Sequence, residues 1–299
     1  MKNFLTLTRM RMRLALRNRL FIFFSLIMPL GFFFLYMGFF AKGEPRKATY
    51  LLGPVIALTV MGSFWGLSTA LVTFREQGIL LRFRVAPVTS SEMLASSISA
   101  NYLLTLPTVM VELLLARWIY HVHDMGNLIP LAILVTVGTV SFAALGLVIA
   151  SVANTMQETQ IICQIIWFAL IFLSGATLPL PFLPHIVQRV AVFLPATYLV
   201  LGLQKTLLDN AAVWNLFVEI ASLLIWAALT FFISAKLFRW ESEEKVTRRA
   251  KLWAVATILP FLLFGLWENK YGGVRAQAQS AYAATQVSPS ANPDANPCR

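Results

Sequence analysis

The sequence predicts an all-α membrane protein, a polytopic bundle with six spanning helices. The chain is 58% hydrophobic and 12% charged, with a mean hydropathy of +0.73. Soluble domains are about 45 to 50% apolar and about 25% charged. The apolar residues also fall into runs of roughly 20 residues, the length at which a helix crosses a bilayer. Lipid, not water, is therefore expected to cover most of the surface.

Residues 1–19 predict a basic helix that lies on the membrane surface and precedes the first span. One helical face carries the apolar residues Phe4, Leu7, Met10 and Leu14. Arginines occupy much of the remaining surface, at Arg9, Arg11, Arg13 and Arg17. Such a helix rests along the headgroups of an anionic leaflet. The alternative is a simple cluster of positive charge that orients the first span.

Six apolar runs within the transmembrane domain, 20–237, supply the spans. They lie at about 20–41, 50–73, 98–120, 128–153, 160–178 and 214–237. The first run is too long for a signal peptide and has no small-residue cleavage site after it, so we expect it to remain as a span.

The C-terminal part contains a seventh apolar run, 252–267, with Pro260 at its middle. Its short length leaves open whether it crosses the membrane or lies in the interface, and so which side holds the C-terminus. The tail, 268–299, is rich in Ala, Gln, Ser, Asn and Pro and is predicted to be disordered.

The distribution of basic residues predicts the orientation. Lys and Arg cluster in 2–19, in 75–84 and in the basic and acidic segment 238–251, each beside a helix end. The positive-inside rule places such clusters in the cytoplasm. We therefore expect a multi-pass protein of the inner (plasma) membrane with a cytoplasmic N-terminus. The net charge of +11 then reflects membrane topology, and we predict no nucleic acid as a partner.

The predicted cytoplasmic loop 74–93, FREQGILLRFRVAPVTSSEM, carries the most information. Its first half mixes apolar and charged residues, as does a short helix with one apolar ridge that docks on a soluble partner. Pro87 should end that helix. Thr89 and Glu92 match a capping box, which predicts that the third span begins near Thr89. A solvated loop is the alternative, but it leaves the ridge without a partner.

The segment 178–210, predicted on the outer side, is mostly apolar but interrupted by prolines. Irregular backbone must be covered by protein or lie at the interface. We expect one or two short helices that re-enter the outer leaflet. An extra pair of spans is the alternative.

No motif of an enzyme is present in the sequence. The phosphate-binding pattern GxxxxGK[ST], the zinc pattern HExxH and the nucleophile pattern GxSxG do not occur. His121, His123 and Asp124 lie in a short outer loop and are more simply read as solvated than as a weak metal site. We predict no catalytic residue and no metal.

Glu112 lies inside the third apolar run, where a charge is costly enough to suggest a function. It would line a substrate path, pair with Arg117, or bond across helices as a structural brace. The second span carries small residues at every fourth position, Gly62, Gly66 and Ala70, which permit another helix to approach closely.

Four features make residues 1–241 resemble the membrane permeases of type-2 ATP-binding-cassette (ABC) exporters, which move drugs, lipids or polysaccharides. The first is the basic helix before the first span. The second is the stretch RE-x-G-x-L-x-R with a following proline and serine, matched by Arg75, Glu76, Gly78, Leu80 or Leu81, Arg82, Pro87 and Ser90. The third is a P-x-T-Y turn in the outer segment, matched by Pro195, Thr197 and Tyr198. The fourth is the aromatic and basic run Phe238, Arg239 and Trp240.

The resemblance implies that the loop is a coupling helix, which docks in a groove of an ATPase subunit. The implied coupling residues are Arg75, Glu76, Gly78, Leu81, Arg82 and Arg84. Because this sequence has no ATP-binding motif, ATP and Mg would bind in that separate subunit. Two copies of each chain would form the assembly, as a homodimer of the permease or with a similar permease.

We therefore predict the permease subunit of an ABC exporter. It would move a hydrophobic or amphipathic drug, lipid, glycolipid or polysaccharide across the inner membrane by alternating access. The alternative is an ion-coupled secondary transporter that uses Glu112. A membrane enzyme has no supporting motif.

Overall fold

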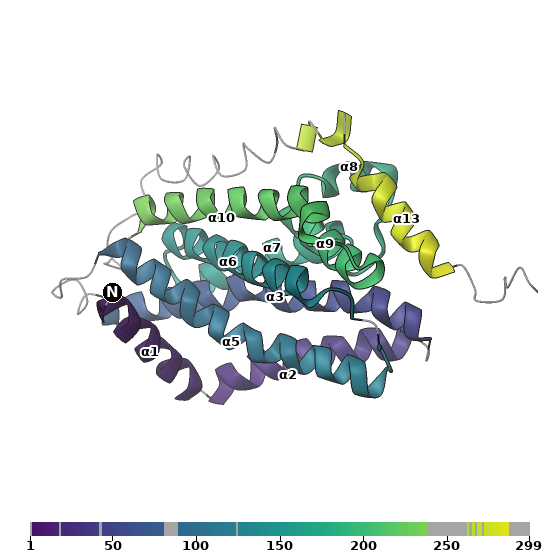
Figure 1. The fold of residues 1–299 in the computed structure, drawn as a ribbon. Helices are drawn as coiled ribbons and strands as arrows, with labels where there is room; N and C mark the ends of the chain where they lie inside the picture. Colours follow the sequence, from purple (N-terminus) through teal and green to yellow (C-terminus); the bar gives the residue numbers. More distant parts are fainter. Residues whose placement is uncertain are drawn as a thin grey trace, which may run out of the picture.

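The computed structural model describes residues 2–17, 19–41, 44–80, 89–123 and 125–238, and in the C-terminal part 262, 265–266, 268–270 and 272–286. Throughout these residues the regular elements are helices, arranged as an elongated bundle (Figure 1). The predicted all-α class is confirmed.

Among the described residues, five helical segments are long and apolar enough to cross a membrane. They are α3 (Pro45–Glu76), α5 (Ser90–Ile119), α6 (Leu128–Val152), α7 (Met156–Leu173) and Val213–Leu237, which joins η3 (Val213–Leu216) to α10 (Phe217–Leu237). These correspond to the second to sixth predicted spans. The first predicted span is α2 (Arg19–Tyr36), which continues into the π-helical turn η1 (Met37–Ala41).

Capping residues decide where these helices begin. The predicted capping box is present, with the Thr89 side chain accepting from Glu92 N and the Glu92 side chain accepting from Thr89 N. The helix α7 begins four residues before its predicted start at 160, because Thr155 Oγ1 accepts from Glu158 N at 3.1 Å. This T-x-x-E pattern is readable in the sequence, although apolar content alone does not reveal it.

The helices α3 and α6 form the centre of the bundle. Burial reaches 72% of the most apolar window of α3 and 67% of that of α6, but only 28% for α5 and 22% for α7. The two central helices approach closely at Gly146, where an added Cβ would lie 2.4 Å from Phe64 O. The close contact therefore depends on Gly146 of α6, whereas Gly62 of α3 only reaches the Trp167 ring on α7.

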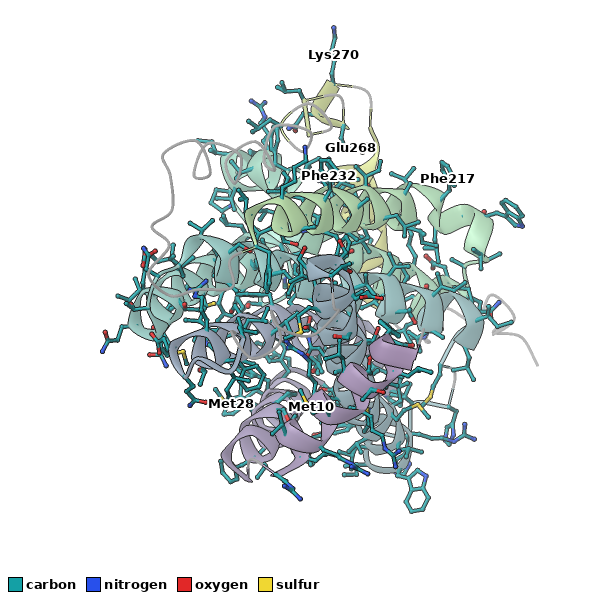
Figure 2. The ribbon with its side chains drawn as sticks, turned by 90° about the vertical axis from the view of Figure 1, so that its left-hand side faces the viewer. Met10, Met28, Phe217, Phe232, Glu268 and Lys270 are labelled. Carbon is teal, nitrogen blue, oxygen red and sulfur yellow. The ribbon has the colours of Figure 1, made fainter. Side chains whose placement is uncertain are left out.

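Large apolar side chains point away from the bundle around its circumference. Met28 and Phe217 lie at the outside in Figure 2, and these two residues and Phe232 are each more than half exposed. Contact with lipid removes the cost that such a surface has in water. The exposed apolar side chains thus agree with the membrane location predicted from composition.

The proline-rich segment 178–210 forms η2 (Leu180–Phe182), α8 (His185–Ala191) and α9 (Pro195–Asp209). The axes of α8 and α9 differ by 92°. Most of α9 is buried, and it packs against α3 and α10. The segment is therefore a sharply bent helix pair held by the bundle.

Part of the tail predicted to be disordered is a helix, α13 (Val274–Gln286), so that prediction is wrong for these residues. Val274 and Ala278 pack with Leu180 and Tyr198, and the Tyr282 ring lies 4.9 Å from that of Phe182. Alanine and glutamine favour helix, and this helix buries a stripe with a spacing of four residues. The predicted segments 238–251 and 252–267 lie almost wholly outside the described residues.

The two ends of the bundle hold different elements (Figure 1). The N-terminal helix α1 (Lys2–Arg17) lies at one end, beside the start of α5 and the last residues of α3 and α10. The elements α8, α9 and α13 lie at the opposite end. We call these the α1 end and the α13 end.

Candidate coupling site

At the α1 end, Arg75 and Glu76 hold the turn between α6 and α7. The guanidinium of Arg75 donates from Nη1 to Ala150 O at 2.8 Å and from Nη2 to Ala153 O at 2.5 Å. Glu76 Oε1 accepts from Met156 N at 2.8 Å. A cation at the C-terminus of one helix and an anion at the N-terminus of the next both complement the helix dipoles. The pair thus satisfies backbone groups that helix ends leave open.

These contacts keep the Arg75 side chain buried in the bundle. Its exposure is 5%, whereas Glu76 is exposed. The resemblance implied that both residues meet an ATPase subunit, but in this structure Arg75 faces the α6–α7 turn. The pattern could not show this, because the bonded carbonyls lie 75 and 78 residues further along the chain.

Gly78 ends α3 and turns the chain back toward the bundle. It has a φ of +67°, a conformation that glycine adopts without strain. Leu80 follows and is buried with Leu7 and Met93, beside Phe74. The start of the predicted coupling segment is therefore anchored under α1 and α5. The remaining predicted coupling residues, Leu81, Arg82 and Arg84, lie outside the described residues.

The helix α1 faces the bundle differently from the prediction. Its buried residues are Leu7, Thr8 and Arg11, whereas Leu14 is 40% exposed. Arg9, Arg13 and Arg17 are exposed, as expected for a helix at a membrane surface. The apolar stripe read from the sequence is thus only partly buried, because an arginine takes a position on the inner face.

Arg11 is 6% exposed and has no carboxylate partner among the described residues. Its Nη2 lies 3.6 Å from Met93 Sδ, and its guanidinium carbon lies 5.5 Å above the Phe74 ring. Burial lowers the pKa of Arg11 to about 10, so the side chain stays charged at neutral pH. The charged Arg11 side chain therefore contacts a sulfur atom and an aromatic ring rather than an anion.

At the α13 end, the predicted turn residues close the bend between α8 and α9. Thr197 Oγ1 donates to Ala191 O at 2.6 Å, and Tyr198 OH donates to Val192 O at 2.8 Å. Pro195 occupies the first turn of α9, where its missing N–H is not needed. The P-x-T-Y pattern thus ties the end of α8 to the start of α9.

At mid-bundle, Glu112 of α5 is fully buried and accepts from Thr59 Oγ1 of α3 at 2.5 Å. The pairing with Arg117 is not seen, because Arg117 is exposed. Of the three roles considered, the geometry matches the brace between helices. The buried Glu219, near the α13 end, forms an ion pair with the partly buried Lys205 that no sequence pattern indicated.

The loop between α5 and α6 holds the rings of His121 and His123 stacked with their centroids 6.2 Å apart. Within the described part of the chain, no three His, Cys, Asp or Glu side chains gather in a way that could hold a metal ion. Asp124 lies outside that part.

Residues 2–208, more than half of the chain, match the family described as ABC-2 type transporter. The chain belongs to the ABC-2 type transporter family. The coupling motif, the mid-bundle Glu112 and the P-x-T-Y turn all lie within the matched residues, whereas α10 and α13 lie beyond them.

Several relatives of this ABC-2 protein are named as permeases. The linearmycin resistance permease protein LnrN of Bacillus subtilis is 25% identical over 61% of this chain and 47% of its own length. The putative transport permease YvfS of the same organism is 22% identical over 75% of this chain and 94% of its own length. The probable multidrug ABC transporter permease YbhS of Escherichia coli is 26% identical over 59% of this chain and 48% of its own length. The chain thus spans about half the length of the first and third of these relatives.

Proposed function

We propose that this chain is the permease subunit of an ATP-driven exporter, with the α1 end in the cytoplasm and a separate ATPase subunit docked there. In this arrangement α8 and α9 re-enter the outer leaflet. The names of two relatives, a linearmycin resistance permease and a probable multidrug permease, support export of a drug or another hydrophobic or amphipathic compound. ATP and Mg would bind in the ATPase subunit.

The main support for the proposal is that Arg75 and Glu76 hydrogen-bond to the α6–α7 turn. The loop that would meet the ATPase begins directly after these residues. A displacement of that loop reaches α6 through Arg75 and α7 through Glu76. It also reaches α1 and α5 through Leu80. One short segment therefore acts on several spans at once, which is what conversion of ATPase movement into transport requires.

A second copy of the chain would pack against α7. Only 22% of its most apolar window is buried, less than in α3, α5, α6 or Val213–Leu237. Its exposed stripe consists of Ile161, Ile165, Phe168 and Phe172. Apolar residues on one face suit either lipid or another permease. In the proposed assembly, two permeases and two ATPase subunits alternate between inward-open and outward-open states.

Co-purification tests the proposal. The full chain, solubilised in mild detergent from its native membranes, should retain an ATPase. Leu81→Asp should reduce the co-purified ATPase activity at least about tenfold, because a buried charge at an interface core costs more than 1.4 kcal/mol. Leu178→Asp, the same substitution near the α13 end, should have no effect.

Absence of an ATPase from the wild-type preparation in several detergents would argue against this function. Ion coupling through Glu112 would then be the function to examine, and Glu112→Gln should abolish transport while ATP depletion should leave wild-type transport unchanged.

A further inference from the structure

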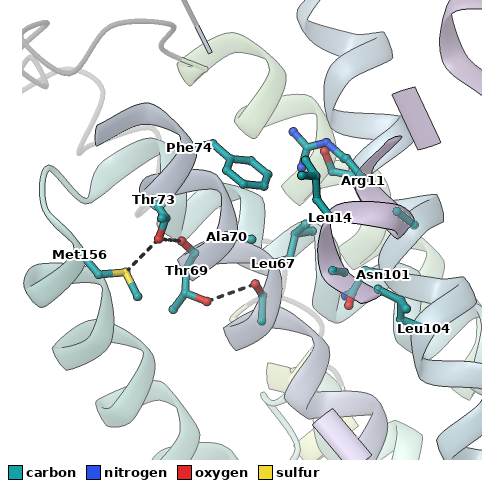
Figure 3. A pocket seen from close by; sticks show the side chains of 14 residues that line it. Arg11, Leu14, Leu67, Thr69, Ala70, Thr73, Phe74, Asn101, Leu104 and Met156 are labelled. Carbon is teal, nitrogen blue, oxygen red and sulfur yellow. Dashed lines mark hydrogen bonds between the residues drawn. The ribbon is translucent and has the colours of Figure 1, made fainter. Parts of the chain in front are cut away.

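A cavity of about 330 Å³ lies at the α1 end between α1, α3, α5 and the first residue of α7 (Figure 3). Small side chains at Ala70 and Ala100 leave the space open. Pockets for organic ligands begin at about 300 Å³. The cavity is therefore large enough for a headgroup and the first part of an apolar chain.

Arg11 is the one charged residue of the lining. Its Nε is buried and has no hydrogen-bond partner among the described residues, and its Nη2 has only the sulfur of Met93. A guanidinium carries five N–H donors, and burial of a charge without a strong partner is costly. An anion beside Arg11 would remove that cost. A bidentate bond to phosphate or carboxylate is the preferred form of such a contact.

The other polar groups of the lining offer mainly acceptors. Thr69 Oγ1 donates to Trp65 O at 2.9 Å, and Thr73 Oγ1 donates to Thr69 O at 2.8 Å. Asn101 Nδ2 donates to Ser63 O at 3.0 Å. Their remaining lone pairs suit the hydroxyl groups of a ligand. Figure 3 places Arg11 and Asn101 across the cavity from Thr69 and Thr73.

The rest of the wall is apolar. Leu67, Ala70 and Leu104 form a surface beside Arg11, and the partly exposed Leu14 stands at the edge of the cavity. A ligand with one anionic group and one apolar chain matches this division. The polar end would contact Arg11, and the chain would follow the leucines.

We propose that this cavity binds an anionic amphiphile, with its phosphate or carboxylate on Arg11, hydroxyl groups near Asn101, and its apolar chain along α3 and α5. The site consists of residues of this chain alone. It does not depend on the proposed function, because binding needs no ATPase subunit and no transport.

Native mass spectrometry of the purified full chain tests the site with phosphatidylglycerol and phosphatidylcholine as probes. We expect phosphatidylglycerol to bind in preference to phosphatidylcholine. Arg11→Gln should lower the phosphatidylglycerol affinity about tenfold, the equivalent of one charge-assisted contact. Arg13→Gln removes the same charge from an exposed position of the same helix, and it should leave the affinity within about twofold, as for a screened surface charge.

Two further measurements distinguish a lipid headgroup from free phosphate as the anion bound at Arg11. Ala70→Phe, which fills the cavity and keeps Arg11, should reduce phosphatidylglycerol binding as Arg11→Gln does. Inorganic phosphate should compete weakly, because it has no apolar chain. Equal losses in Arg11→Gln and Arg13→Gln, full binding in Ala70→Phe, or efficient displacement by inorganic phosphate would each overturn the proposal.

Discussion

Two turns, one at each end of the bundle, are held by hydrogen bonds of different range. At the α1 end, Arg75 and Glu76 bond to groups 75 to 80 residues away, on two other helices. At the α13 end, Thr197 and Tyr198 bond to carbonyls six residues before them. The α1 end therefore links separate spans, whereas the bend at the α13 end is closed by its own neighbours. A displacement of Arg75 and Glu76 therefore reaches α6 and α7 as well as α3, at the end where an ATPase is proposed.

The two ends also differ in the contacts of their positively charged side chains. Lys205 near the α13 end is paired with Glu219. Arg11 at the α1 end contacts a sulfur and a ring, neither of which carries a negative charge. Among the described residues, Arg11 thus has no compensating negative charge. This agrees with an anion site beside Arg11.

The largest expected effect concerns the sides on which the two ends lie. The last residues of α10 pack at the α1 end through Phe238, while Asn269 Nδ2 donates to Arg189 O of α8 at 3.1 Å. Phe238 and Asn269 therefore lie at opposite ends of the bundle, and we expect the C-terminus on the side opposite the N-terminus.

Cysteine labelling in intact cells measures this. In a background with Cys163→Ser and Cys298→Ser, a membrane-impermeant maleimide should label Gln279→Cys on α13 and leave Arg13→Cys on α1 unlabelled. Both positions are exposed. Labelling of both after lysis is the control for reactivity. Labelling of Arg13→Cys alone in intact cells would invert the orientation, and labelling of neither would place both ends inside.

The next effect is on stability at the α1 end. Arg75→Ala leaves two carbonyls at the end of α6 without their donor, and we expect a loss of about 3 kcal/mol, as for hydrogen bonds to a charged group. The melting temperature of the purified protein in detergent should fall by several degrees. Arg9→Ala removes an equal charge from an exposed position at the same end and should leave the melting temperature nearly unchanged. Similar falls in both variants would show that net charge, not the hold on α6, stabilises this end.

Arg75→Lys sharpens the same comparison. Lysine keeps the charge but lacks the planar fork that reaches both Ala150 O and Ala153 O. The melting temperature of the Arg75→Lys variant should lie between those of the wild type and Arg75→Ala.

The sequence was informative where a feature depends on local periodicity or on a short pattern. Apolar runs located the spans, and Thr89 with Glu92 located the start of α5. The turn at Pro195 was also readable, since its bonds are local. The inward position of Arg75 and the Lys205–Glu219 pair depend on which helices become neighbours. The helix α13 was missed because its stripe is stabilised by a surface formed from other segments.

The smallest effect is expected from Tyr198→Phe at the α13 end. The substitution keeps the buried ring and removes one donor to Val192 O, at a cost of about 1 kcal/mol. Hydrogen exchange should rise in α8 and the first turn of α9, and stay unchanged at the α6–α7 turn. Arg75→Ala should raise exchange at that turn and in α7 instead. If Tyr198→Phe also loosened the α6–α7 turn, the α13 end would be coupled to the rest of the bundle as tightly as the α1 end, and the distinction between a linking end and a self-contained end would fail.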